Sequence, residues 1–171
     1  MMAAGRLMQI KCRLVRHANL RRFSIFVERA MGTTGVTALD HTVQETNVWL
    51  KAVEEELELD NRHEAYSALR AVLHALRDRL PPEVAIKFGA QLPALIRGFY
   101  YEGWHAAGTP TKERHVEEFV AHVLSELPQK YPVDALTVTQ GVFEVLWEKL
   151  DPGEFEKVMH HLPVSLRTMK A

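Results

Sequence analysis

Through most of the chain, apolar side chains recur every three or four positions, which is the period of an amphipathic helix. This pattern predicts a first helix over about residues 43–58 and a second over about 62–79. The second helix ends before two prolines because proline cannot continue a helix, and Pro82 suits the first position of a third helix. Pro93 begins a fourth helix that we expect to reach Trp104. The pattern therefore predicts an all-α fold.

The same pattern occurs twice, at a spacing of 70 residues. Aligning residues 45–100 with residues 115–170 requires no gap and gives twelve identities, among them Leu92-Pro93 with Leu162-Pro163. We interpret the chain as a tandem duplication of a three- to four-helix unit, with copy one at about 42–104 and copy two at about 112–171. The two copies are expected to pack as one helical bundle domain about a pseudo-twofold axis. The helices expected in copy two are 112–127, 133–149, 152–161 and a short one from Pro163.

Composition narrows the class of protein. The chain has 171 residues, of which 47% are apolar and 25% are charged, so it is long enough to bury a core of its own. The single cysteine, Cys12, excludes an intramolecular disulfide framework and a cysteine-based zinc cage. No apolar stretch approaches the roughly 20 residues that a membrane-spanning helix needs. We expect a soluble, cytoplasmic protein.

Charge is distributed unevenly. Residues 1–30 contain seven basic residues and one acid, a net charge of +6, so the rest of the chain carries −7 against a total of −1. Such a leader is typical of a transit peptide, of a nucleic-acid or lipid-binding arm, or of sequence upstream of the true start. Because residues 1–30 lack a clear period, we favour a disordered extension or a start at Met31. A core with a charge of −7 lacks the basic surface that phosphate binding needs, so no nucleic-acid partner is expected for it.

Several short sequence motifs are distinctive when they are taken together, and they lie at 40–44, 49–50, 80–83, 91–93 and 95–104. Together they resemble a known family, the bacterial domain of unknown function DUF2267. The resemblance covers about residues 31–171 and implies a helical tandem domain, but it implies no reaction, cofactor or catalytic residue.

Sequence motifs for catalysis are absent. The chain has no glycine-rich nucleotide loop and no nucleophile elbow. His63-Glu64 begins like a zinc-protease helix, but the second histidine position is Ser67, and the pair Glu102 and His105 lacks the second copy that a di-iron site needs. We therefore expect no metal, no cofactor and no catalytic residue, and the chain reads more as a non-enzyme than as an enzyme.

The aromatic segment (residues 97–104) breaks the symmetry of the duplication, because copy two ends in residues 168–171, which contain no aromatic residue. Its candidate ligand- or partner-binding residues are Arg97, Tyr100, Tyr101 and Trp104, since aromatic side chains concentrate binding energy. The alternative is that the rings fill the seam where the two copies meet.

Helical spacing assigns directions to the side chains of this segment. On a helix that begins at Pro93, the expected inward stripe contains Leu95 and Phe99, with Ile96 beside them, whereas Tyr101 falls about 200° from Phe99 and is expected to point outward. In the seam interpretation, Gly98 lets two helices approach closely.

Two classes of function follow. The first is a non-enzymatic interaction or regulatory module with a protein partner, and homo-oligomerisation is compatible with it. The alternative is a small-ligand-binding protein or enzyme with a pocket at the seam, in which Arg97 holds an anion and Tyr100 or Tyr101 donates hydrogen bonds. Convergence of Arg97 and Tyr101 on a pocket would favour the second class, and a filled seam would favour the first.

Overall fold

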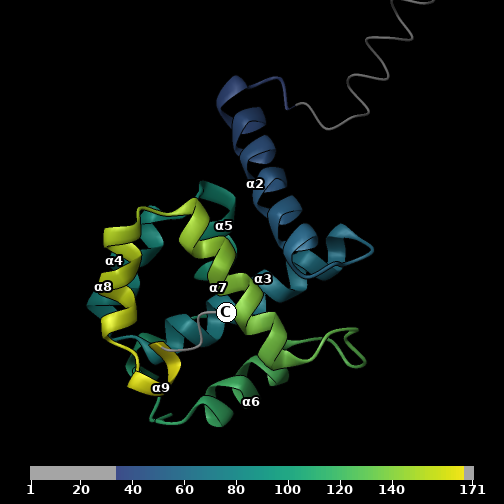
Figure 1. Cartoon of the computed structure of the whole chain (residues 1–171). Helices are drawn as coiled ribbons and strands as arrows, with labels where there is room; N and C mark the ends of the chain where they lie inside the picture. Colours follow the sequence, from purple (N-terminus) through teal and green to yellow (C-terminus); the bar gives the residue numbers. More distant parts are fainter. Residues whose placement is uncertain (1–33, 168–171) are drawn as a thin grey trace, which may run out of the picture. The chain divides into compact units, whose positions relative to one another are not determined.

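The computed structural model describes residues 34–167, and every regular element within that range is a helix (Figure 1). The all-α prediction is confirmed. The predictions for residues 1–30 and for the end of copy two at 168–171 lie outside the described residues. The helices are α2 (Thr37–Glu56), α3 (Arg62–Arg79), α4 (Pro82–Gln91), α5 (Ala94–Tyr100), the short 3₁₀ helix η1 (Ala106–Gly108), α6 (Val116–Glu126), α7 (Ala135–Lys149), α8 (Pro152–His160) and α9 (Val164–Arg167).

The chain divides after His41 into two compact units, whose described parts are residues 34–41 and residues 42–167. In the first unit, the carboxylate of Asp40 accepts a hydrogen bond from the hydroxyl of Thr34 at 2.9 Å and another from its backbone N–H. The second unit contains the core and all the candidate site residues.

Local signals set most helix ends. Asn61 caps α3 by accepting a hydrogen bond from the backbone N–H of Glu64, and α3 spans the predicted residues 62–79. Pro82 and Pro152 stand at the first positions of α4 and α8, as predicted. The fourth helix ends at Tyr100 rather than at Trp104, before Gly103 takes a φ of 65° that favours glycine.

Helix α6, the first helix predicted for copy two, begins at Val116, four residues later than expected. The carboxylate of Glu118 accepts hydrogen bonds from the backbone N–H groups of Arg114 (2.7 Å) and His115 (3.2 Å), which satisfies donors at the start of the helix. These two hydrogen bonds lower the pKa of Glu118. The carboxylate of Glu118, six residues inside the predicted range, thus helps to set the observed start at Val116.

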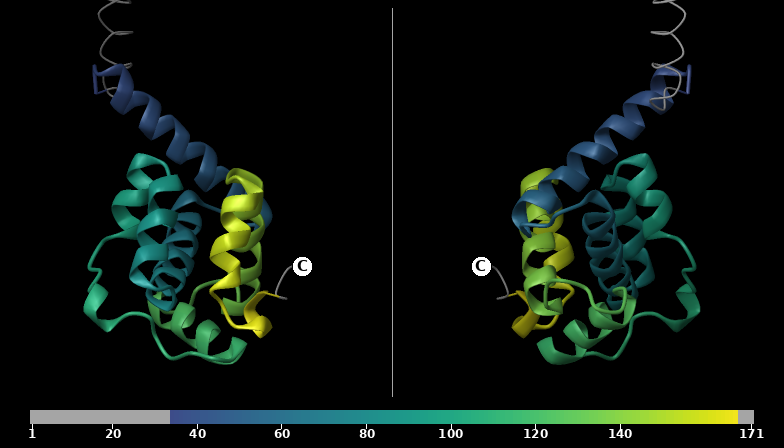
Figure 2. Two further views of the ribbon diagram at one scale, coloured as in Figure 1. Left: turned by 90° about the vertical axis from the view of Figure 1, so that its left-hand side faces the viewer. Right: turned by 90° about the vertical axis from the view of Figure 1, so that its right-hand side faces the viewer.

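Helix α3 forms the centre of the second unit. It packs against α5, α6 and α7, and α4 packs against α8 (Figure 2). The buried leucines of the two predicted copies, Leu92 and Leu162, are 3% and 1% exposed. Aromatic rings fill much of the remaining core, and they include Phe88, Tyr100, Phe119, Phe143 and Phe155.

The buried face of α5 differs from the expectation. Ile96 and Tyr100 are wholly buried, whereas Leu95 is 46% exposed, so placing Leu95 on the inward stripe was wrong. Because Tyr100 rather than Phe99 defines the buried face, Tyr101 lies only about 100° from that face and is half-buried. The expectation that Tyr101 points outward is therefore wrong as well.

Close packing also involves a different glycine. A Cβ atom on Gly98 would have no neighbour within 4 Å, so Gly98 allows no close helix approach, contrary to expectation. A Cβ on Gly89 of α4 would instead lie 2.2 Å from the hydroxyl oxygen of Tyr101. Gly89 therefore provides the space in which the ring of Tyr101 rests.

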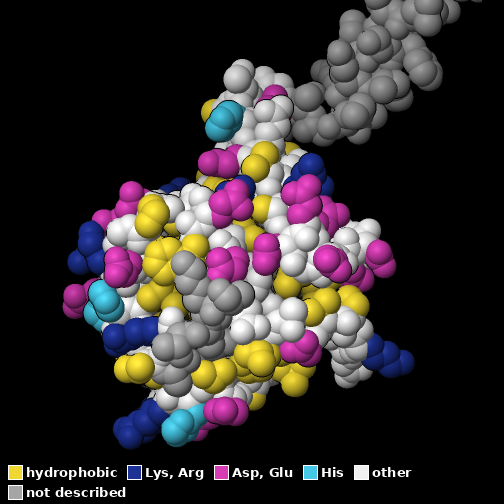
Figure 3. Space-filling model, viewed as in Figure 1, with side chains coloured by type: hydrophobic (Ala, Val, Ile, Leu, Met, Phe, Trp, Pro, Cys, Tyr) yellow, Lys and Arg dark blue, Asp and Glu magenta, His cyan; other side chains and the backbone are white. Residues whose placement is uncertain are grey.

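The surface shown in Figure 3 has acidic side chains scattered among apolar and basic ones. Within the described part of the chain, no helix combines the length and apolar character that crossing a membrane requires.

Candidate functional site

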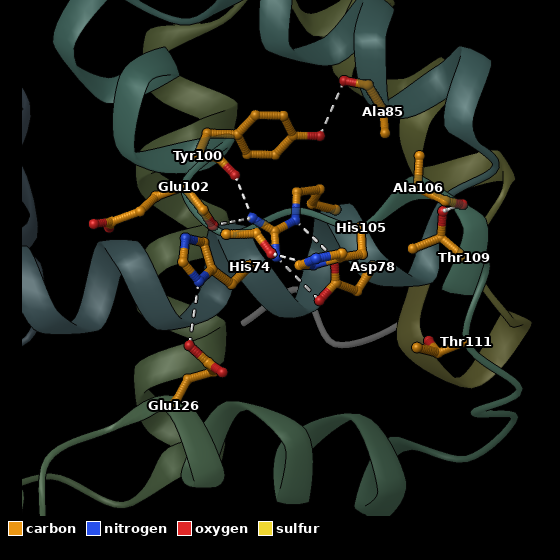
Figure 4. A network of polar contacts seen from close by, with 12 residues as sticks. His74, Asp78, Ala85, Tyr100, Glu102, His105, Ala106, Thr109, Thr111 and Glu126 are labelled. Atoms are coloured by element: carbon orange, nitrogen blue, oxygen red, sulfur yellow. Dashed lines mark hydrogen bonds and ion pairs between the residues drawn. The ribbon is translucent and has the colours of Figure 1, made fainter.

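Two buried side chains of α3, Arg77 and His74, hold the end of α5 in place (Figure 4). One terminal nitrogen of Arg77 donates to the carbonyl oxygens of Tyr100 at 2.6 Å and Glu102 at 3.0 Å. The carboxylate of Asp78 binds the same guanidinium through both of its oxygens, at 2.7 and 3.1 Å. The last carbonyls of a helix have no partner within the helix, so Arg77 satisfies groups that would otherwise be buried unpaired.

His74 supports the same turn. Its Nε2 lies 2.7 Å from the carbonyl oxygen of Phe99, and this nitrogen must donate because a carbonyl oxygen only accepts. Its Nδ1 lies 3.2 Å from the carboxylate of Glu126 on α6. Arg70 also contacts Glu126 and reaches the carboxylate of Glu102 at 3.2 Å. The polar residues of α3 therefore link the aromatic segment to α6 and stabilise the fold.

The structure places three of the four predicted site residues in the packing of this segment. Tyr100 is wholly buried, and its hydroxyl donates to the carbonyl oxygen of Ala85 at 3.0 Å. The hydroxyl of Tyr101 donates to the carbonyl oxygen of Ile86 at 3.2 Å. Burial raises the pKa of both hydroxyls. Because both phenols bind backbone of α4, neither has a donor left for a ligand.

The other two predicted site residues differ from each other. Trp104 is half-buried and stacks on Tyr101, with ring centroids 5.6 Å apart. Arg97 is exposed on α5. The rings of Tyr100 and Tyr101 meet edge to face with centroids 4.8 Å apart, so the three aromatic side chains form one continuous cluster. The segment therefore fills space against α4, and Arg97 is the one predicted site residue whose side chain is presented to solvent.

A small polar hollow of about 190 Å³ lies beside this network. Arg77 and Asp78 line it, together with His105, Thr109 and Thr111 from the connection that follows the aromatic segment. Because Asp78 and two carbonyl groups already occupy the guanidinium, Arg77 has no strong donor to offer an anion here. We do not assign a ligand to this hollow.

The α4–α8 groove is a second and larger hollow, with a volume of about 250 Å³. Its floor consists of the buried residues Phe88, Leu150, Phe155 and Val158, with half-buried Val84 beside them. Its rim consists of exposed polar residues: Lys87, Gln91, Glu154, Lys157 and His161. A groove with an apolar floor and a few polar groups at its mouth is typical of a small-molecule site.

The residues that line this groove recur at helical spacing on α4 and α8. On α4, Phe88 of the floor lies one turn after Val84, and Gln91 of the rim lies one turn after Lys87. On α8, Lys157 occupies the position 70 residues after Lys87. Prolines begin both helices and set the start of these turns.

A family model described as "Uncharacterized conserved protein (DUF2267)" matches residues 46–169, which is more than half of the chain. The chain belongs to the DUF2267 family. The resemblance seen in the sequence is thereby confirmed, over a range that begins at residue 46. No curated protein matches the chain.

Sequence reasoning about this DUF2267 protein did not single out the α4–α8 groove. One signal was available: Lys87 and Lys157 are among the identities at a spacing of 70 residues, and exposed lysines at equivalent positions of two helices are not explained by core packing. Four of the groove's pairs share that spacing: Val84 with Glu154, Lys87 with Lys157, Phe88 with Val158, and Gln91 with His161. The space between the helices, however, is not visible in the sequence.

Proposed function

We propose that this DUF2267 protein is a binding protein without catalytic chemistry of its own, which holds an apolar group of a small ligand in the α4–α8 groove. The observation that carries the proposal is a hollow of about 250 Å³ whose floor is made of buried apolar side chains. Protein interiors are normally packed to the density of organic crystals, so a hollow lined by phenylalanine and valine is a site for an apolar group.

The proposal includes the tandem duplication, because the groove then lies at the seam between the two copies. Its support is the order of the helices: α4 and α5 follow α3 as α8 and α9 follow α7, with starts 70 residues apart for α4 with α8 and for α5 with α9. The equivalent pairs that line the groove support the same interpretation. A cytoplasmic location remains part of the proposal.

The other hypothesis, a protein-interaction module that binds through the aromatic segment, now depends on Arg97. The hydroxyls of Tyr100 and Tyr101 bind backbone of α4, and Trp104 stacks on Tyr101. This hypothesis stays a prediction, and we place it second because an exposed arginine alone is an ordinary surface residue.

Titration of the full chain with octan-1-ol, followed by NMR, tests the proposal. We expect saturable shifts of the methyl and aromatic signals of Val84, Phe88 and Val158, because the alcohol has an apolar tail and no charge. Val158→Phe should abolish these shifts by filling the groove, whereas Val48→Phe, at a position 56% exposed on α2, should leave them unchanged. Shifts that do not saturate, or that persist in Val158→Phe, would contradict the proposal.

A further inference from the structure

We infer that the ligand of the α4–α8 groove is a medium-chain carboxylate, with its alkyl tail on the apolar floor and its carboxylate between Lys87 and Lys157. This inference rests on the proposed function and names the class of ligand. It is carried by the juxtaposition of an apolar hollow with two lysines at equivalent positions on opposite sides of its rim.

The size of the hollow sets the length of the tail. A hollow of about 250 Å³ has room for an alkyl chain of several methylene groups, because a single water molecule needs far less space. The floor presents aromatic and branched aliphatic side chains with no polar group, which suits an unbranched alkyl chain and offers no partner to a sugar or a nucleobase.

The charges at the rim set the head group. Lys87 is exposed and makes no ion pair with the described residues, whereas Lys157 pairs with Glu154 on the same helix. Asp151 also lies near Lys157, and its carboxylate caps the start of α8 by accepting from the backbone N–H of Glu154. The groove's own lining thus presents two cations, Lys87 and Lys157, against one carboxylate, Glu154.

The positive charge at the rim is opposite in sign to the net charge of the rest of the domain. From Met31 onward the chain carries a net charge of −7. Two lysines facing one apolar hollow on an acidic domain select an anion there and disfavour a cation. A carboxylate, with two acceptor oxygens, binds ammonium groups from both sides at once.

The first experiment compares three ligands of equal tail length on the full chain by calorimetry at low salt: octanoate, octan-1-ol and octylammonium. We expect octanoate to bind about tenfold more tightly than octan-1-ol, because exposed ion pairs contribute a factor of a few each. Octylammonium should bind more weakly than the alcohol, and added salt should reduce the advantage of octanoate. Equal affinity for all three would overturn the carboxylate inference while leaving the groove as an apolar site; no binding of any of them would overturn the proposed function itself.

Charge variants then locate the carboxylate. Lys87→Gln should remove about threefold of the preference for octanoate, and Lys157→Gln should remove more because it leaves Glu154 unpaired at the rim. Glu154→Gln should act in the opposite direction and tighten octanoate binding. The matched control is Lys112→Gln, at an exposed lysine outside the groove that also lacks an ion-pair partner among the described residues. Equal effects of Lys87→Gln and Lys112→Gln would overturn the inference.

Tail length provides the last test. From butanoate to octanoate, affinity should rise about fourfold for each added methylene group, and beyond about ten carbons it should rise no further because the hollow is full. Val158→Phe should abolish the binding of every carboxylate in this series. Octanoate that binds Val158→Phe as it binds the wild type would place the site elsewhere and overturn the inference.

Discussion

Arg77 shows how a charged residue becomes part of the core. It is 4% exposed, yet all of its neighbours are acceptors: a carboxylate and two carbonyl oxygens at the end of α5. Removing such a group leaves several polar atoms without partners, and this costs more than the pair itself contributes.

Arg77→Met should therefore lower the free energy of unfolding by about 3 kcal/mol, measured by urea denaturation. The substitution keeps most of the apolar stem but removes the guanidinium. The matched control is Arg97→Met, at an exposed position 20 residues later, where a change within about 0.5 kcal/mol is expected. Similar losses in the two variants would show that Arg77 is not the residue that holds α5.

His122 of α6 makes stability depend on pH. Its Nδ1 lies 2.8 Å from the carboxylate of Glu113, and this hydrogen bond raises the pKa of His122 above 6.5, helped by the charges of Glu113, Asp78 and Glu126 and opposed by burial. Because the pKa is raised in the folded state, the stabilisation of the fold by protonated His122 is fully present below about pH 6.5. It is lost as the pH rises through the pKa of His122 in the folded protein.

The free energy that His122→Gln removes should consequently be about 1 kcal/mol larger at pH 6 than at pH 9. Paired urea titrations of wild type and variant at both pH values measure this difference. His63→Gln, at an exposed histidine at the start of α3, serves as the matched control. A larger loss at pH 9 than at pH 6 would contradict the assignment.

Helix α7 packs closely against the end of α2. A Cβ atom on Gly141 of α7 would lie 2.5 Å from a methyl group of Leu57, which is itself buried. Gly98 of α5 has no neighbour within 4 Å of such an atom and is exposed. Both glycines lie inside helices, so they share the low helix propensity of glycine and differ in the space around them.

Gly141→Ala and Gly98→Ala should accordingly change stability in opposite directions. Gly141→Ala should lower the free energy of unfolding by about 1 kcal/mol, because overpacking outweighs the gain in helix propensity. Gly98→Ala should raise it by about 0.5 to 1 kcal/mol, because only the gain in propensity remains. Thermal melts of the two variants side by side measure the signs, and stabilisation by both would show that α7 and the end of α2 are not in close contact.

At the scale of the whole molecule, one core stabilises the second unit, and residues from both halves of that unit's sequence contribute to it. Leu92, which follows α4, and Leu162, which follows α8, are both buried, at 3% and 1% exposure. Leu95, three residues after Leu92, is 46% exposed and provides a leucine outside the core.

Leu92→Ala and Leu162→Ala should each cost about 2 to 5 kcal/mol in urea denaturation, with one cooperative transition in each case. Leu95→Ala should cost less than about 1 kcal/mol. Two separate transitions would indicate that the halves unfold independently, and a loss below about 0.5 kcal/mol at either buried leucine would contradict a shared core.

The sequence alone determined the class of fold, the bounds of most helices and the family. These features follow from neighbours in the chain: a proline at Pro82 or Pro152, a cap at Asn61, an apolar residue every three or four positions. The sequence also aligned Leu92 with Leu162 at a spacing of 70 residues, and both leucines are buried.

Only the tertiary structure decided which face of α5 is buried and what the aromatic segment does. The helical period predicted Leu95 and Phe99 on the inward face. The burial of Tyr100 instead depends on backbone carbonyl groups of α4, which accept from the tyrosine hydroxyls, and on Arg77 in α3. The hollow between α4 and α8 was also undetermined, because whether two helices fill the space between them depends on side-chain volumes about 70 residues apart. A periodic pattern indicates which side of a helix is apolar. Which segment packs against that side, and whether a gap remains between them, is decided only when distant segments pack together.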